Sequence, residues 1–85
     1  MGRVVYKKAA VKALKKLPKT IRHGFLSAFR HIAEGHTTGL DIRKLTGREG
    51  YRLRIGPYRG LYRIDHQGEC IVVVVTIKPR GDAYK

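Results

Sequence analysis

The spacing of apolar residues changes along the chain, and each change marks an expected element of secondary structure. Residues 3–7 (RVVYK) combine β-branched and aromatic side chains, which is typical of a short strand. Over residues 8–16 the apolar positions recur at helical spacing and lysines fill the other side, which predicts an amphipathic helix. A second helix is expected over residues 20–34, with Thr20 as its cap and Gly35 as its stop. Its apolar stripe consists of Ile21, Phe25, Phe29, Ile32 and Ala33.

Alternation of apolar and basic residues over residues 51–64 predicts a β-hairpin that turns at Gly56 and Pro57. The expected cross-strand pairs are Ile55–Tyr58, Arg54–Arg59 and Arg52–Leu61. This register places on one face the arginines Arg52, Arg54, Arg59 and Arg63. Like charges directly opposite each other destabilise a sheet, and guanidinium groups match phosphate oxygens bidentately. We therefore expect the cluster to hold a polyanion; the alternative is a solvated basic face in a generally basic protein.

Residues 70–77 (CIVVVVTI) form an apolar run without alternation, which predicts the central strand of a sheet. Residues 36–50 contain several glycines and threonines and predict an extended loop, and residues 78–85 form a polar tail. The expected order is β-α-α-β-β-β. The fold class is therefore α+β: a single domain over residues 1–85, in which the N-terminal strand and an αα-hairpin pack on one face of a small, mainly antiparallel four-stranded sheet. The other face carries the arginines.

The composition adds a strong positive charge. There are 19 Lys and Arg residues against 6 Asp and Glu residues, which gives a formal net charge of +13. Such a charge attracts nucleic acid or an acidic partner but does not choose between them. Cys70 is the only cysteine, which excludes an intrachain disulfide and suits a reducing cytoplasm. No apolar run is long enough to span a bilayer, so no membrane association is expected.

The basic residues at the C-terminal end of the chain extend the candidate site. A last strand that ends beside the hairpin brings Lys78, Arg80 and Tyr84 to the side of the hairpin arginines. A tyrosine at the rim of a basic groove stacks on bases of single-stranded nucleic acid. The same groove suits RNA cleavage, which needs a base for the 2′-OH proton, stabilisation of charge on the phosphorus and an acid for the leaving 5′-oxygen. Arginine supplies the stabilisation of charge on the phosphorus. Neighbouring positive charges lower the pKa of a tyrosine or lysine, which makes either side chain better able to act as the base.

Other chemistries lack their residue patterns. His31 and His36 do not have metal-ligand spacing, and the few carboxylates form no obvious pair for a two-metal nuclease or a glycosidase. No glycine-rich phosphate loop or nucleophile elbow is present. We expect neither a metal nor a cofactor.

The chain resembles the RelE/ParE superfamily of toxins from type II toxin-antitoxin modules over nearly its whole length. The likeness runs through "KKAAVKALKKLPKTIR", "LDIRKLTG", "YRLRIGPYRGLYRI" and "KPRGDAY", and the third of these is the most specific. In the RelE branch the toxin cuts mRNA in the ribosomal A site by metal-free attack of the 2′-OH. The ParE branch inhibits DNA gyrase without catalysis. Both branches are held inactive by an antitoxin that wraps the toxin with an extended segment.

By motif position, the resemblance implies a catalytic set of Arg52, Arg54, Arg59, Lys78, Arg80 and Tyr84. The two arginines of the first hairpin strand stand where relatives often have lysine or arginine. Because neither position holds a lysine that could act as a base, proton transfer is assigned to Tyr84 or to water. The resemblance thus implies a RelE-like fold and a cytoplasmic, ribosome-dependent mRNA endoribonuclease. Its implied partners are mRNA, the ribosome and a cognate antitoxin with an acidic or amphipathic wrapping segment, through which alone it would reach operator DNA. The alternatives are a ParE-like gyrase inhibitor and a basic RNA-binding module.

Overall fold

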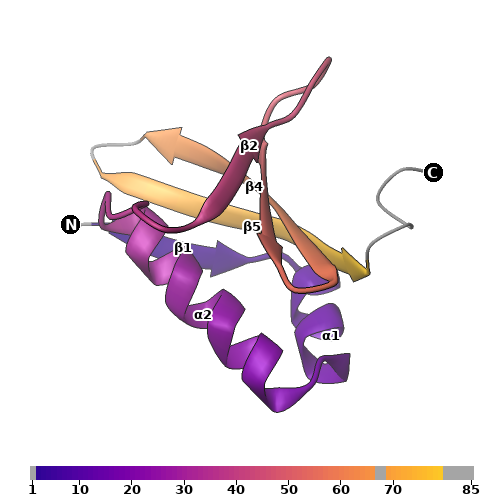
Figure 1. The fold of residues 1–85 in the computed structure, drawn as a ribbon. Coiled ribbons are helices and arrows are strands. Elements are labelled where there is room, and N and C mark those ends of the chain that lie inside the picture. The colour runs from indigo at the N-terminus through magenta and orange to yellow at the C-terminus, as the bar shows by residue number, and fades with distance from the viewer. Residues whose placement is uncertain (1, 67–68, 80–85) are drawn as a thin grey trace.

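The structure, a computed structural model, describes residues 2–66 and 69–79 and is an α+β fold with two helices and one sheet (Figure 1). The elements in chain order are β1 (Gly2–Tyr6), α1 (Lys8–Lys16), α2 (Lys19–Ala33), β2 (Asp41–Lys44), β3 (Tyr51–Ile55), β4 (Tyr58–His66) and β5 (Cys70–Pro79). The predicted fold class is therefore confirmed in its main features. Within the described ranges, no helix has both the length and the hydropathy needed to cross a membrane.

The sheet is mixed, with the strand order β1-β5-β4-β3-β2. Strand β1 runs parallel to β5, and every other neighbouring pair is antiparallel. The apolar strand β5 is paired on both sides, as its lack of alternation predicts, although β4 holds the middle position. Gly56 takes a positive φ of 56° at the hairpin turn, a conformation that glycine adopts without steric cost.

Two expectations were wrong in detail. The sheet has five strands rather than four, because part of the expected loop pairs with the free edge of β3 as β2. The loop after β2 is closed by a hydrogen bond of 3.0 Å from the Leu45 amide to the Gly50 carbonyl, with Gly50 at a positive φ. Thr20 is not the cap of α2, since the helix begins at Lys19 and its capping residue is Pro18, without a side-chain bond.

Both helices pack on one face of the sheet and build the core there (Figure 1). Phe25 and Phe29 of α2 are fully buried and stack on each other with ring centroids 5.9 Å apart. Phe29 also contacts the ring of Tyr6 edge-on from β1 and that of Tyr62 from β4. These aromatic contacts join α2 to strands on both sides of β5, so one helix fixes most of the sheet.

A glycine in β4 lets α2 approach the sheet closely. A Cβ atom on Gly60 would lie 2.9 Å from Cζ of Phe29 and 3.1 Å from Cε1 of Phe25. Real Cβ atoms do not approach carbon this closely without displacement of a neighbour. Glycine at this position is therefore required by the helix above it and not by the backbone conformation of the strand.

We expect Gly60→Ala to destabilise the domain by about 1–3 kcal/mol, the usual effect of overpacking a core. Thermal unfolding followed by circular dichroism measures the change. Gly24→Ala in α2 is the matched control, because its Cβ would lie at an ordinary 3.6 Å from Ile55. Replacing a helical glycine there should raise the free energy of unfolding by about 0.5–1 kcal/mol. An equal unfolding temperature for wild type and Gly60→Ala would contradict this account of the packing.

Burial raises the pKa of Tyr62 to about 12, and the neighbouring Tyr51 adds to the rise. Because this value lies above that of an unfolded tyrosine, the folded state keeps the proton longer and the free energy of unfolding falls between about pH 10 and pH 12. Urea unfolding at about pH 8 and about pH 11 measures this fall. The free energy of unfolding should fall less between the two pH values for Tyr62→Phe than for wild type. An equal loss of the free energy of unfolding in the two proteins would contradict the burial of the phenol.

Candidate nucleic-acid interface

Two rows of side chains cross the sheet on the face opposite the helices. Residues paired across neighbouring strands point to the same face, so the strand register defines each row. The first row is Asp41–Arg54–Arg59–Lys78 and the second is Arg43–Arg52–Leu61–Thr76. The register predicted for the hairpin is thus confirmed. Lys78 lies beside Arg59, as expected for a last strand that ends next to the hairpin.

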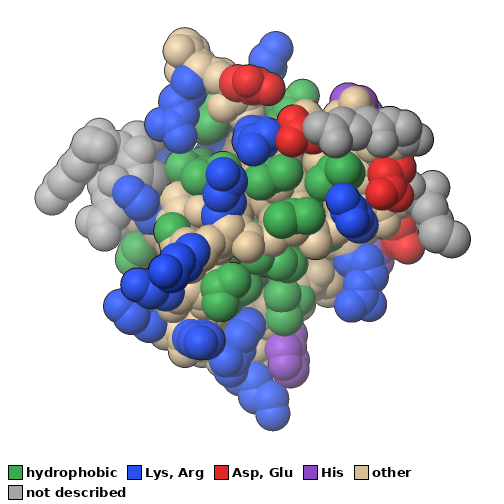
Figure 2. Space-filling view, turned by 180° about the vertical axis from the view of Figure 1, so that it is seen from behind, with side chains coloured by type: hydrophobic (Ala, Val, Ile, Leu, Met, Phe, Trp, Pro, Cys, Tyr) green, Lys and Arg blue, Asp and Glu red, His purple; other side chains and the backbone are tan. Residues whose placement is uncertain are grey.

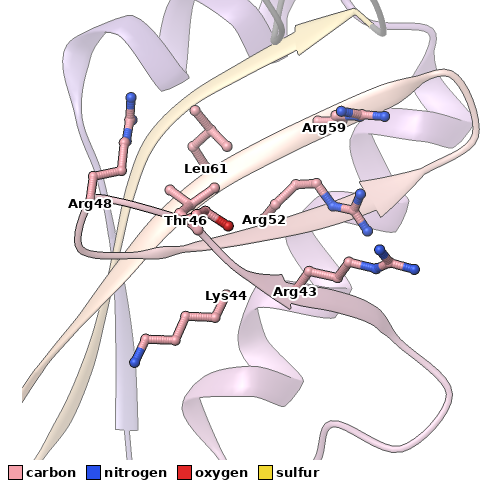
Figure 3. A pocket seen from close by; sticks show the side chains of 8 residues that line it. Arg43, Lys44, Thr46, Arg48, Arg52, Arg59 and Leu61 are labelled. Carbon is pink, nitrogen blue, oxygen red and sulfur yellow. The ribbon is translucent and has the colours of Figure 1, made fainter.

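A hollow of about 360 Å³ lies over these rows. It is lined by Arg43, Lys44, Leu45, Thr46, Arg48, Arg52, Arg59 and Leu61. Figure 3 shows the guanidinium groups of Arg43, Arg52 and Arg59 lying near one another, although they come from β2, β3 and β4. The side chains of Lys44 and Arg48 point in other directions in the same view. The hollow therefore has three neighbouring guanidinium groups along it and a partly apolar wall at Leu45 and Leu61.

Arg59 differs from the other arginines in its burial. Only 4% of it is exposed, and it is the charged residue that stands among the buried positions of the described chain. A guanidinium group stays charged at any accessible pH, and a charge held away from water acts more strongly on its surroundings. Arg59 therefore provides a fixed and largely buried positive charge beside the hollow.

Two carboxylates engage arginines on this face. Asp41 accepts a hydrogen bond of 2.9 Å from Nη2 of Arg52, and its other oxygen lies 3.3 Å from Nε of Arg54. Asp65 accepts a bond of 2.7 Å from Arg63 farther along β4. The predicted arginine cluster therefore divides: Arg52 and Arg59 line the hollow, Arg54 borders them in the first row, and Arg63 pairs separately.

The segment that follows α2 contributes basic residues to the hollow that were not among the predicted site residues. Arg43, Lys44 and Arg48 belong to the stretch that was expected to be a loop. The available signal was the alternation of apolar Leu40 and Ile42 with charged neighbours, which is the period of a strand. Of the other predicted site residues, Arg80 and Tyr84 lie outside the residues that the structure describes.

The shape of the hollow marks the site more clearly than charge alone. Figure 2 shows Lys and Arg side chains spread over the face seen from behind, with hydrophobic side chains between them. Basic side chains are therefore spread over this surface. The group of neighbouring guanidinium groups along the hollow, by contrast, lies in one place. Guanidinium groups in such an arrangement can bind a phosphate group and stabilise negative charge that develops on it. Within the described part of the chain, no three or more His, Cys, Asp or Glu side chains are grouped to hold a metal ion.

Comparisons with known proteins match this architecture. Residues 4–84 match the model of a family described as the ParE toxin of the type II toxin-antitoxin system. The chain is similar to a chain of the RelB-RelE antitoxin-toxin complex from Methanococcus jannaschii, at 26% identity and a TM-score of 0.74, with 94% of each chain covered. The RelBE2 toxin-antitoxin complex from Mycobacterium tuberculosis matches at 26% identity and a TM-score of 0.69, over 93% of this chain and 98% of that one.

The isolated RelE toxin from E. coli matches at 20% identity and a TM-score of 0.73, with 99% of this chain and 92% of that chain covered, and shows the shared fold. A search of curated proteins found no match.

Arg43→Gln should weaken binding of a short 2′-O-methyl RNA, which cannot be cleaved through its 2′ position. The binding constant K falls as the salt concentration rises. Loss of one phosphate contact makes the slope of log K against log salt concentration shallower by about 0.7 for a single strand. Fluorescence anisotropy over a salt series measures this slope. Lys15→Gln, an equal loss of charge on exposed α1, is the control and should leave the slope close to that of wild type. Equal slopes for the two variants would remove Arg43 from the interface.

Proposed function

Since the chain belongs to the ParE toxin family of type II toxin-antitoxin systems, within the RelE/ParE superfamily, we propose that it acts as a ribosome-dependent mRNA endoribonuclease of the RelE kind. The observation that carries this proposal is the hollow that is lined by Arg43, Arg52 and Arg59 from three neighbouring strands. Its volume of about 360 Å³ is in the range of small-ligand sites, and its charge suits a nucleotide with its phosphate.

The proposed reaction is an internal transfer at phosphorus. The 2′-oxygen attacks the adjacent phosphorus while the bond from phosphorus to the 5′-oxygen breaks, which leaves a 2′,3′-cyclic phosphate and a 5′-hydroxyl. Arg52, Arg54 and Arg59 hold the phosphate and stabilise the negative charge that develops on it. Lys78, next to Arg59 in the first row, extends this positive charge. We propose that Arg80 adds to it. The proton of the 2′-OH passes to Tyr84 or to water, and a second proton is delivered to the leaving 5′-oxygen.

The proposed partners follow from the charge and from the family. A net charge of +13 favours association with ribosomal RNA and with an acidic protein segment. The two solved relatives at 26% identity are complexes of a toxin with its antitoxin. We propose a cognate antitoxin with an acidic or amphipathic wrapping segment, operator DNA contacted only through it, and a cytoplasmic site of action, where ribosomes are.

A second candidate function rests on a separate observation. The family model that matches residues 4–84 is that of ParE toxins, whose branch inhibits DNA gyrase without catalysis. In that case the basic face would contact a protein surface, and no phosphate would be cut. The two functions share a fold, so only an assay of activity distinguishes them.

Primer extension on a defined mRNA, with and without programmed ribosomes, tests the proposal. Wild type should produce cuts at A-site codons only when ribosomes are present. Arg54→Gln should lower the cleavage rate by about 10²- to 10³-fold, the usual effect of removing a group that stabilises transition-state charge. Tyr84→Phe should abolish cleavage if the phenol takes the proton. Arg54 is partly exposed, so the substitution should leave thermal unfolding unchanged.

Arg3→Gln is the matched control, since Arg3 is well exposed in the edge strand β1 and its loss changes the net charge equally. It should cleave at the wild-type rate. Absence of cuts by a wild-type preparation that still arrests growth would overturn the ribonuclease proposal. Inhibition of gyrase supercoiling by the same preparation would then support the second function.

A further inference from the structure

A carboxylate of the protein already occupies part of the arginine cluster. Asp41 lies directly opposite Arg54 in the sheet and is diagonal to Arg52. One of its oxygens accepts a hydrogen bond of 2.9 Å from Nη2 of Arg52, and the other lies 3.3 Å from Nε of Arg54. Two guanidinium groups that converge on the two oxygens of one carboxylate bind it as they would bind a phosphate.

Arg52 has bonding capacity that Asp41 does not use. Its Nε is buried and has no hydrogen-bond partner among the described residues, while its Nη2 is held by Asp41. The side chain is 14% exposed and lines the hollow, so it has little access to water in place of a partner. A guanidinium group recognises phosphate best through two parallel N–H bonds. The present pairing therefore leaves Arg52 with an unmet donor, which the side chain can offer to an incoming anion once Asp41 releases it.

The position of Asp41 suits a side chain that a ligand can displace from Arg52 and Arg54 better than one that pairs with them permanently. Its side chain is 46% exposed, and it belongs to the edge strand β2. Exposed ion pairs contribute little to stability because water and salt compete with them. A polyanion that brings several phosphates to the neighbouring arginines competes more strongly than free salt does.

We propose that Asp41 is a resident competitor for the phosphate site: it holds Arg52 and Arg54 together in the free protein and is displaced from them when an RNA phosphate binds. This inference rests on the proposed action on RNA but concerns binding and not the chemical step. Asp41 is thus a positioning residue that acts through the two arginines. Its negative charge also lowers the affinity of the free protein for polyanions in general, which restricts stable binding to RNA that supplies contacts elsewhere on the basic face.

Binding of a short 2′-O-methyl RNA to Asp41→Asn over a salt series tests the proposal. Asparagine preserves the shape of the side chain and removes its charge. We expect about two- to fivefold tighter binding, the range that exposed ion pairs allow, and a salt slope steeper by about 0.7, equal to one added phosphate contact. Glu69→Gln is the control, because it removes an equal charge from an exposed pair with Arg3 at the β1 edge of the sheet.

The outcomes separate the possibilities. If Asp41→Asn and Glu69→Gln bind equally, the effect is one of net charge and the proposal fails. If Asp41→Asn binds more weakly or loses thermal stability without gaining affinity, Asp41 supports the sheet and the proposal also fails. In an NMR titration of wild type, the Nε–H signal of Arg52 should shift on addition of the same RNA; an unchanged signal would overturn the exchange directly.

Because this RNA cannot be cleaved, the result is independent of nuclease activity. If the protein cuts mRNA but Asp41→Asn and Glu69→Gln bind the RNA equally, the proposed function is supported and this inference fails. If an RNA phosphate displaces Asp41 in a protein that does not cut mRNA, this inference is supported and the proposed nuclease function fails.

Discussion

The close approach of α2 to β4 is the contact on which the rest of the structure depends. Phe25 and Phe29 lie over Gly60, where a methyl group would already collide with both rings. The ring of Phe29 also contacts Tyr6 and Tyr62, so the helix joins β1 and β4 across β5. Both helices lie on this face, so no helix of the described residues covers the opposite face of the sheet. A short chain with a small core can therefore gather its charged side chains there.

That gathering of charge has a cost within the sheet. Arg54, Arg59 and Lys78 stand side by side in one row, and like charges directly opposite each other destabilise paired strands. The apolar ladder of β5 and the aromatic core on the other face offset this repulsion, and Asp41 neutralises part of it at the β2 edge. Local arrangements that oppose stability are characteristic of functional sites. The rows of charge are thus better explained by a ligand than by folding.

The family explains why one scaffold is compatible with two activities. The model that matches the chain is that of ParE toxins, while the two solved relatives at 26% identity are RelE complexes. In this chain the fold positions basic side chains of β3, β4 and β5 on one face. Which target is used depends on the side chains within and around the hollow, and the fold itself does not decide it.

The sequence by itself determined the elements whose signals are local. Helical periodicity fixed α1 at residues 8–16, and the Gly56-Pro57 turn fixed the pairing of Arg54 with Arg59. Strand β2 was missed because the alternation of Leu40 and Ile42 with charged residues is short and lies among glycines, and the strand pairs only with β3. The hollow with Arg43, the pairing of Asp41 with two arginines and the burial of Arg59 were decided by the tertiary structure. They depend on strand order and on how helices cover the sheet, which are contacts between distant residues that no local pattern encodes.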